Sequence, residues 1–242
     1  MSDTPVALVT GGGTGIGAAC CRQLAAEGFR VGVHYRSSEE KAQKLVAELP
    51  DAFAVRANLS ESAEIDALVA ELKQLAGRVD VLVNNAGTNV NAPMLAMKLE
   101  DYDAVSGLAR GSWYLTKLVL RRFMLRKGSG RIINISSVVG HTGNPGQIPY
   151  TMVKAGLDAF TKSLAQELAG RDMLCNSVAP GFIDTEMTSE LPAEVKQSIL
   201  DRIPLGRMGA AHEVADVVAF LATRGSYVNG TVIHVNGGMY GG

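Results

Sequence analysis

The stretch TGGGTGIG (residues 10–17) is the most informative part of this chain for its fold, because five of its eight residues are glycine. It follows the apolar run VALVT (6–10) directly. It precedes a segment (15–28) in which apolar residues recur at helical spacing. The sequence therefore places a flexible, glycine-rich turn at the first junction between an expected strand and an expected helix.

The spacing of these glycines is typical of a loop that holds phosphates. Gly11, Gly15 and Gly17 have the spacing G-x-x-x-G-x-G, and Gly13-x-Gly15-x-x-Ala18 also fits the dinucleotide pattern. Glycines here permit a tight turn and let the backbone approach a pyrophosphate, which rests on the N-terminus of the following helix. The alternative is a purely structural turn. The position at the first strand-to-helix junction favours a dinucleotide site.

Short apolar runs and amphipathic stretches alternate along the rest of the chain. The expected strands are residues 6–10, 30–35, 53–59, 79–84, 130–136, 174–180 and 231–235, with helical patterns such as 15–28, 38–49 and 60–76 between them. Apolar strands that alternate with helices indicate a parallel sheet covered on both faces. The sequence thus predicts an α/β fold, with residues 1–242 forming a single doubly wound Rossmann-type domain around a seven-stranded parallel sheet.

One segment departs from this alternation. Residues 184–213 lie between two expected strands and are longer than an ordinary crossover. Ligands of doubly wound sheets bind beyond the carboxyl ends of the strands, so an insertion there is a candidate substrate lid. A surface pair of helices or an oligomer contact is the alternative.

Composition excludes several classes of protein. The chain has 242 residues, of which 47% are apolar and 19% charged, and its formal net charge is −1. These values argue against disorder and against nucleic acid as the main partner. No apolar run approaches the roughly 18 residues that span a membrane. Three cysteines without zinc spacing, and an N-terminus without a secretion signal, predict a cytoplasmic protein; the four scattered histidines predict no metal site.

The end of the second expected strand indicates which dinucleotide binds. A site specific for NAD usually has Asp or Glu there, accepting a hydrogen bond from the ribose 2′-hydroxyl. This chain reads HYRSS (34–38) instead, so Arg36, Ser37 and Ser38 are available to a 2′-phosphate. An exposed loop arginine is the plain alternative. The missing acid favours NADP(H).

A tyrosine and a lysine are the candidate catalytic pair. Tyr150 and Lys154 are four residues apart on an expected helix and therefore share one face. An ammonium beside a phenol favours phenolate and lowers the pKa of the phenol from about 10, which makes the tyrosine a usable acid and base. Ser136 or Ser137, at the end of the preceding strand, could hydrogen-bond a substrate oxygen.

These pieces together resemble the short-chain dehydrogenase/reductase family over essentially the whole chain. The matching motifs are TGGGTGIG, NNAG (84–87), the Ser137, Tyr150 and Lys154 constellation, PGFIDTEMT (180–188) and HVNGGMY (234–240). Within that family the chain is most similar to the β-ketoacyl-acyl-carrier-protein reductases of fatty acid synthesis, through SSVVGHTGNPGQ, YTMVKAGL, IPLGRMG and VNGGMY.

The resemblance implies a homotetramer that uses NADPH to reduce 3-oxoacyl thioesters to 3-hydroxyacyl thioesters. Ser137 would polarise the ketone, Tyr150 would protonate it, and Lys154 would hold the nicotinamide ribose. The expected cofactor-binding residues are Gly11, Gly13, Thr14, Gly15, Ile16, Gly17, Arg36, Ser37, Asn58, Leu59, Asn84, Ala86, Gly87, Tyr150, Lys154, Pro180, Gly181, Ile183 and Thr185. Of these, Asn58 would meet the adenine, and Ile183 and Thr185 the nicotinamide amide.

The same resemblance suggests a docking site for acyl carrier protein. Arg126, Lys127 and Arg171 fall where such reductases keep basic residues that receive this acidic partner. A basic patch of this kind would raise the rate of association more than the affinity. Ordinary solvated surface cations are the alternative.

The stretch VSGLARGSWYLTK (105–117) departs from the family pattern. Relatives have an Asn in this helix that holds a water linking the catalytic lysine to solvent, whereas this chain has Leu108 there and is one residue short. Gly107 and Gly111 each cost a helix about 1 kcal/mol. We therefore expect an irregular or mobile helix around residues 106–109, an incomplete proton relay and reduced activity. A cofactor-binding protein with little catalysis, or a reductase of another ketone or secondary alcohol, remains an alternative function.

Overall fold

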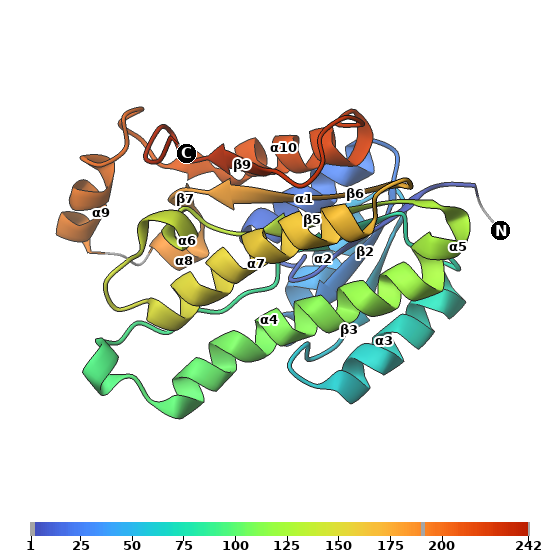
Figure 1. Ribbon diagram of the computed structural model, residues 1–242, viewed down its shortest axis with the longest axis horizontal. Coiled ribbons are helices and arrows are strands. Elements are labelled where there is room, and N and C mark those ends of the chain that lie inside the picture. The colour runs from blue at the N-terminus through green and yellow to red at the C-terminus, as the bar shows by residue number, and fades with distance from the viewer. Residues whose placement is uncertain (1–2, 190–191, 242) are drawn as a thin grey trace.

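The computed structural model describes residues 3–189 and 192–241 and contains a seven-stranded parallel sheet of order β3-β2-β1-β4-β5-β6-β9 (Figure 1). The strands are β1 (Val6–Val9), β2 (Arg30–Tyr35), β3 (Ala52–Arg56), β4 (Val81–Asn84), β5 (Ser129–Ile135), β6 (Asp172–Pro180) and β9 (Val232–Val235). Each lies on one of the predicted apolar runs, which confirms the Rossmann-type fold. The chain crosses over between β1 and β4, so their carboxyl ends frame the crevice where ligands of such sheets bind.

Helices cover both faces of the sheet, as predicted. They are α1 (Gly15–Ala26), α2 (Glu39–Glu48), α3 (Ser62–Leu75), α4 (Leu99–Val119), α5 (Leu125–Lys127), α6 (Val139–Thr142), α7 (Ile148–Glu167), α8 (Glu186–Ser189), α9 (Ala193–Leu200) and α10 (Ala211–Thr223), with short turns η1 (Met94–Ala96) and η2 (Leu120–Met124). Residues of α1, α2 and α10 share one apolar core with the sheet, and residues of α3, α4 and α7 share the other. Within the described residues, no helix is long and apolar enough to cross a bilayer.

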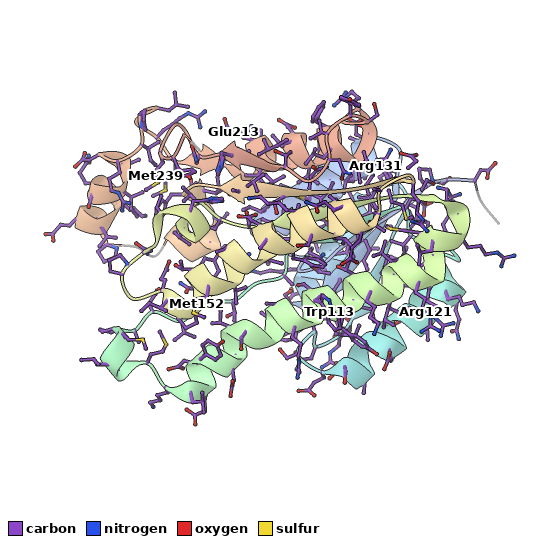
Figure 2. The ribbon with its side chains drawn as sticks, viewed as in Figure 1. Trp113, Arg121, Arg131, Met152, Glu213 and Met239 are labelled. Atoms are coloured by element: carbon purple, nitrogen blue, oxygen red, sulfur yellow. The ribbon has the colours of Figure 1, made fainter. Side chains whose placement is uncertain are left out.

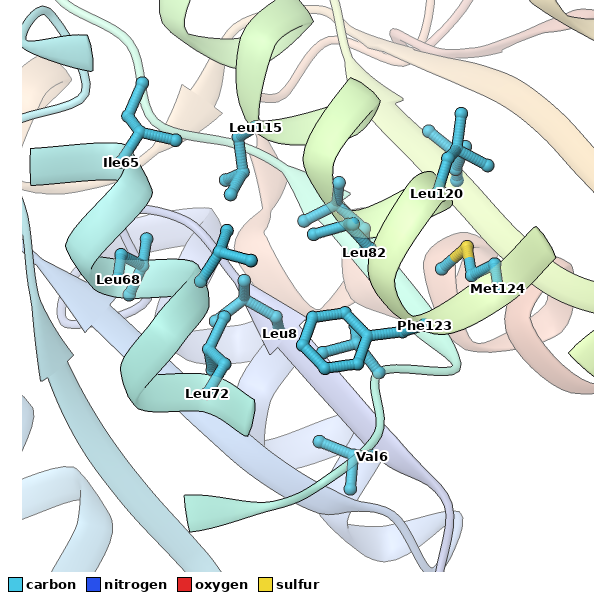
Figure 3. Close-up of a cluster of buried hydrophobic side chains, with 14 of the residues drawn as sticks. Val6, Leu8, Ile65, Leu68, Leu72, Leu82, Leu115, Leu120, Phe123 and Met124 are labelled. Atoms are coloured by element: carbon cyan, nitrogen blue, oxygen red, sulfur yellow. The ribbon is translucent and has the colours of Figure 1, made fainter. Parts of the chain in front are cut away.

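The core on the α3–α4 side fixes the position of α4 relative to the strands. Figure 3 shows Leu68 and Leu72 of α3 facing Leu115 of α4 above Leu8 and Leu82 of the sheet. All five side chains are buried, with at most 1% of their surface exposed. Burying a leucine completely stabilises a fold by roughly 1.5–3 kcal/mol, so this cluster holds α4 firmly against the sheet.

The helix α4 corrects one expectation from the sequence. It runs without a break from Leu99 to Val119, so residues 106–109 are regular helix. The irregularity lies further on, in the π-helical turn η2, where each hydrogen bond spans one residue more than in an α-helix. Gly111 explains the regular geometry: a Cβ there would be 1.9 Å from the carbonyl oxygen of Leu59, so the glycine lets α4 rest on the loop after β3.

The long segment 184–213 is tied down at its base. The strands β7 (Ile183–Asp184) and β8 (Gly209–Ala210) pair in parallel and form a separate two-stranded sheet. The helices α8 and α9 lie in the chain between these two strands, and residues 190 and 191 of the same segment lie outside the described residues. Figure 1 shows α8 and α9 at the same end of the molecule as α6 and the start of α7.

Candidate active site

The glycine loop is anchored to the end of β4 by hydrogen bonds of the chain itself. The Thr10 hydroxyl accepts from the backbone N–H groups of Asn85 at 2.9 Å and of Ala86 at 3.0 Å. The Asn85 side-chain amide donates in return to the carbonyl oxygens of Thr10 at 2.9 Å and of Gly11 at 3.1 Å. These bonds join the two strands that frame the crevice and fix the shape of the loop between them.

His34 holds the same loop from the other side. Its Nδ1 accepts from the N–H of Gly11 at 3.1 Å, and its Nε2 lies 3.0 Å from the carbonyl oxygen of Ala57. Burial lowers the pKa of His34 to about 4, against a raising contribution from the bond to Ala57, so the ring is neutral and donates through Nε2. Sequence reasoning found no role for His34, since its two partners lie 23 residues away on either side.

The loop has the shape that a dinucleotide requires. A Cβ at Gly17 would lie 2.1 Å from the carbonyl oxygen of Gly11, so only glycine allows the helix to start this close to the turn. The N-cap of α1, Thr14, makes no side-chain capping bond, and the first turn of α1 carries no acidic residue. The N-terminus of α1 consequently carries a partial positive charge with no competing carboxylate in its first turn, which would suit a pyrophosphate.

The predicted ribose and adenine contacts lie beside this loop. Arg36 and Ser37 are exposed directly after β2. The turn they belong to is close to the loop, because a Cβ at Gly13 would be 3.1 Å from the hydroxyl of Ser38. Asn58 is half-buried, and its side-chain oxygen accepts from the N–H of Ser60 at 3.1 Å, which leaves its amide N–H groups for another acceptor.

Asn84 has a different place from the one expected. The residue is 2% exposed, and its amide nitrogen donates to the Thr116 hydroxyl at 2.9 Å and to the Asn134 side-chain oxygen at 2.8 Å. It therefore ties β4 to α4 and β5 beneath the crevice, and its side chain does not line it. Ala86 and Gly87 are more accessible, and a Cβ at Gly87 would be 3.6 Å from Nζ of Lys154.

Ser137, Tyr150 and Lys154 meet at the carboxyl end of the sheet. The Ser137 hydroxyl lies beside the Tyr150 phenol, and Nζ of Lys154 lies 5.4 Å from the centroid of the Tyr150 ring. The Lys154 ammonium donates to the carbonyl oxygen of Ile135 at 2.7 Å. Ser136, the alternative serine, is buried and bonded to the backbone of Val178. The arrangement brings a phenolic hydroxyl, a serine hydroxyl and an amino group together.

The charges at this site differ from the expectation in one respect. Burial raises the pKa of Tyr150, and the hydrogen bond from Ser137 only partly offsets this, whereas the sequence predicted a lowered value. Burial also lowers the pKa of Lys154 to about 8, against a raising contribution from Asp158. Tyr150 is thus a neutral phenol in the chain alone, ready to donate its proton, and Lys154 changes charge not far above neutral pH.

A small cavity lies next to Lys154, on the side of α4. Its volume of about 10 Å³ is at the lower limit of what can hold one water molecule, and Val105, Leu108, Ala109 and Ser112 line its α4 side. The Ser112 hydroxyl donates to the carbonyl oxygen of Leu108 at 3.0 Å. The segment of α4 that departs from the family pattern therefore lines the same cavity as Lys154, with the Ser112 hydroxyl as its polar group.

The remaining expected cofactor contacts lie after β6. Pro180 ends that strand, and Gly181 approaches the backbone so closely that a Cβ would lie 2.8 Å from Cα of Asn236. Ile183 is buried in β7. The methyl group of Thr185 is 3.5 Å from the position of a Cβ at Gly15, so the start of segment 184–213 touches the glycine loop.

The three basic residues expected to receive a carrier protein lie far from Tyr150 and Lys154. Arg126 and Lys127 belong to α5 and Arg171 precedes β6, at the opposite end of the molecule from α6 and the start of α7 (Figure 1). All three are exposed, but the Lys127 ammonium pairs with the buried Asp80 carboxylate at 2.5 Å. Within one subunit these cations are thus remote from Tyr150.

A glycine loop on the first strand, a Ser-Tyr-Lys cluster at the carboxyl ends of the strands and a seven-stranded parallel sheet define a nucleotide-dependent oxidoreductase. Residues 11–240 match the family described as enoyl-(acyl carrier protein) reductase, and the chain belongs to the short-chain dehydrogenase/reductase family.

Curated relatives give a finer comparison. The chain is 44% identical to the 3-oxoacyl-[acyl-carrier-protein] reductase FabG of Staphylococcus aureus, over 99% of this chain and 100% of the relative. It is 46% identical to the 3-oxoacyl-[acyl-carrier-protein] reductase of Synechocystis sp., over 97% and 96% of the two chains, and 46% identical to FabG of Aquifex aeolicus, over 97% of each.

Proposed function

We propose that this chain reduces 3-oxoacyl thioesters, carried by acyl carrier protein, to 3-hydroxyacyl thioesters with NADPH in fatty acid synthesis. The observation that carries the proposal is the meeting of Ser137, Tyr150 and Lys154 beside a glycine loop shaped for a dinucleotide. The names of relatives that match over nearly the full length support the substrate class.

The chain's own residues supply the acid and the charge that this reaction needs. When bound, NADPH would supply the hydride that the carbonyl carbon accepts. Ser137 hydrogen-bonds the carbonyl oxygen and polarises it, and Tyr150 transfers its phenolic proton to the same oxygen as negative charge develops there. Lys154, held by the carbonyl of Ile135, stabilises the tyrosinate that remains.

The test is a spectroscopic assay of NADPH oxidation with an acetoacetyl thioester. Tyr150→Phe removes the transferred proton and leaves the ring, so we expect turnover to fall by about 10²–10⁴-fold. Tyr227→Phe is the matched control, because that tyrosine is fully exposed and outside the site. Unchanged turnover in Tyr150→Phe would refute the assignment. Dinucleotide binding by the wild-type chain without turnover of any 3-oxoacyl thioester would point to a cofactor-binding protein without catalysis.

The preference for NADPH rests on the turn after β2. Arg36 and Ser37 are exposed beside the glycine loop, and the strand ends in Tyr35 without a carboxylate for a ribose hydroxyl. Arg36→Asp replaces the proposed phosphate ligand by a hydroxyl acceptor. We expect the ratio of kcat/KM for NADPH to that for NADH to fall by at least tenfold, and a ratio that does not change would exclude Arg36 from this role.

Recognition of acyl carrier protein requires more than one subunit in this proposal. Trp113 of α4 and Met152 of α7 are 49% and 55% exposed, on the open face formed by these helices (Figure 2). Apolar side chains on such a face favour contact between subunits, which supports a homotetramer. Across such a contact, Arg126 and Arg171 of one subunit can serve the site of another. Arg126→Glu with Arg171→Glu should raise KM for the carrier-protein substrate and leave KM for a small acetoacetyl thioester unchanged.

The segment 184–213 is proposed to close over the substrate. Its start touches the glycine loop through Thr185, and the exposed Lys41 of α2 pairs with Glu186 of α8 at 2.6 Å. This ion pair connects α2, which follows the turn with Arg36 and Ser37, to the proposed lid. Lys41→Ala should therefore raise the KM for NADPH several-fold, as measured by initial rates at saturating thioester.

A further inference from the structure

The helix α7 carries a third ionisable residue on its catalytic face. Asp158 follows Tyr150 and Lys154 at intervals of four residues, so the three side chains lie one above another along the helix. Asp158 is only 4% exposed. A carboxylate this deeply buried is rare unless a cation or hydrogen bonds compensate its charge.

The first cation near Asp158 is Lys154 itself. The carboxylate favours the charged form of this lysine, against the burial that disfavours it. Around Lys154, α4 and the segment after β4 contribute only uncharged residues. These are Val105, Leu108, Ala109 and Ser112 of α4, and Ala86, Gly87 and Thr88 after β4. Tyr150 is neutral in the chain alone. Asp158 is thus the nearby anion that compensates the buried ammonium.

The second partner is His141, from the short helix α6 that follows Ser137. Its Nε2 lies 2.9 Å from a carboxylate oxygen of Asp158. The His141 ring packs against His234 of β9, with ring centroids 4.7 Å apart, and against Tyr240 near the C-terminus, at 5.1 Å. The cluster therefore joins α6, α7, β9 and the C-terminal segment around one carboxylate.

Only one ring of this cluster pairs with the carboxylate. Burial and then the charge of His141 lower the pKa of His234, against a raising contribution from Asp158, so His234 stays neutral near pH 7. Among the described residues, no group of three His, Cys, Asp or Glu side chains is arranged to hold a metal ion. Within the described part of the chain, His141 Nε2 and the two carboxylate oxygens of Asp158 make no hydrogen bond, so His141 meets Asp158 as a close contact, one helical turn from Lys154.

We propose that Asp158, buried against His141, is a positioning residue that keeps Lys154 in its ammonium form and so sets the alkaline limit of the reaction. Loss of the carboxylate leaves Lys154 buried without a compensating anion, and the lysine releases its proton at lower pH. The tyrosinate formed at Tyr150 then lacks its stabilising cation. The catalytic part of this inference rests on the proposed reductase function, but the charge of Lys154 does not.

The direct test measures the charge of Lys154 without cofactor or substrate. Protein labelled with ¹³C-lysine is titrated by NMR, and the Cε signal of Lys154 is assigned by its loss in Lys154→Arg. Asp158→Asn should lower the midpoint of this signal by about 1 pH unit, because the buried carboxylate one helical turn away favours the ammonium. Glu167→Gln is the matched control, since it removes the same charge from an exposed position on the same helix and should leave the midpoint unchanged.

The second measurement is the pH profile of kcat/KM with NADPH and an acetoacetyl thioester. The alkaline limb should move down by the same amount in Asp158→Asn, a loss of about tenfold well above the midpoint, with little change near pH 6. Asp158→Glu, which keeps the charge, should restore the wild-type limb. Asp158→Leu removes the charge without burying an amide, so the test does not depend on the folding of one variant.

The outcomes separate the two proposals. A Lys154 midpoint that is the same in wild type, Asp158→Asn and Asp158→Leu would overturn this inference, whatever the activity. A shifted midpoint in a chain without turnover of 3-oxoacyl thioesters would support the role of Asp158 and refute the proposed function. Equal shifts in Asp158→Asn and Glu167→Gln would show a general charge effect of the helix and would also overturn the inference.

Discussion

Replacing Gly111 by alanine adds one methyl group where α4 rests on the loop after β3. The new Cβ would lie 1.9 Å from the carbonyl oxygen of Leu59, whereas Cβ atoms keep roughly 3.0 Å or more from other atoms. The helix or the loop must move by about 1.1 Å or more, and both are buried. Overpacking of this kind costs up to about 3 kcal/mol, of which the better helix propensity of alanine returns about 1 kcal/mol. We expect the free energy of unfolding to fall by about 2 kcal/mol.

The second glycine of the same helix provides the control. A Cβ at Gly107 would be 3.2 Å from the hydroxyl of Ser60, which can rotate away, and no backbone atom lies within 4 Å of it outside the helix. Gly107→Ala should therefore stabilise the protein by up to about 1 kcal/mol. For a chain of this size the two changes correspond to a melting temperature about 4–8 °C lower for Gly111→Ala and about 2–4 °C higher for Gly107→Ala.

Thermal unfolding followed by circular dichroism, at one protein concentration for all variants, measures both shifts. Gly111→Ala should also weaken NADPH binding, because the displaced loop carries Asn58 and Leu59 beside the proposed adenine site. Equal melting temperatures for the two variants would refute the packing argument. A higher melting temperature for Gly111→Ala would do so more directly.

Three further changes test other parts of the structure. Asp80 is 7% exposed; burial raises the pKa of its carboxyl, but hydrogen bonds from Arg78 and Lys127 outweigh burial and lower it. The stability that the ionised Asp80 contributes is therefore present above its unfolded pKa and lost in acid. Asp80→Asn should lower the free energy of unfolding in urea by about 3 kcal/mol at pH 7 and by much less near pH 3. His34 has a folded pKa of about 4 against 6.5 unfolded, so wild type should lose about 3 kcal/mol as pH falls through this interval, and His34→Gln should lose much less. Leu108→Asn places an amide at the cavity beside Lys154. If an incomplete proton relay limits turnover, the amide should raise kcat by roughly tenfold. An unchanged kcat would show that the relay does not limit turnover.

The sequence predicted the fold well because the signals for a buried parallel sheet are local. Each strand is covered on both faces, so it appears as an apolar run such as VLVN at β4, and helices of predicted length separate the runs. The glycine loop could also be predicted from the sequence, since positions such as Gly17 have no room for a Cβ atom and permit only glycine. The four-residue helical spacing predicted the pair Tyr150 and Lys154, whereas the choice of Ser137 over Ser136 came from the family resemblance.

The rest depended on contacts between residues distant in the chain. His34 looked unremarkable until the structure brought Gly11 and Ala57 to its two ring nitrogens. The prediction of an irregular helix, made from Gly107 and a segment one residue short, was wrong, because α4 is regular across residues 106–109. Its tertiary packing, with Gly111 against the Leu59 carbonyl, outweighs intrinsic helix propensity. The direction of the Tyr150 pKa shift also depends on burial, which no spacing rule provides.

The hydrogen bonds around Thr10, His34 and Asn85 have a consequence for the affinity with which a dinucleotide would bind. They hold the glycine loop through the chain's own contacts, and the N-terminus of α1 that follows has no side-chain cap. Ordering a flexible loop would cost roughly 1–2 kcal/mol for each backbone residue fixed. A preorganised loop avoids that entropic cost, so the affinity should depend on contacts with the ligand and not on the folding of its binding site.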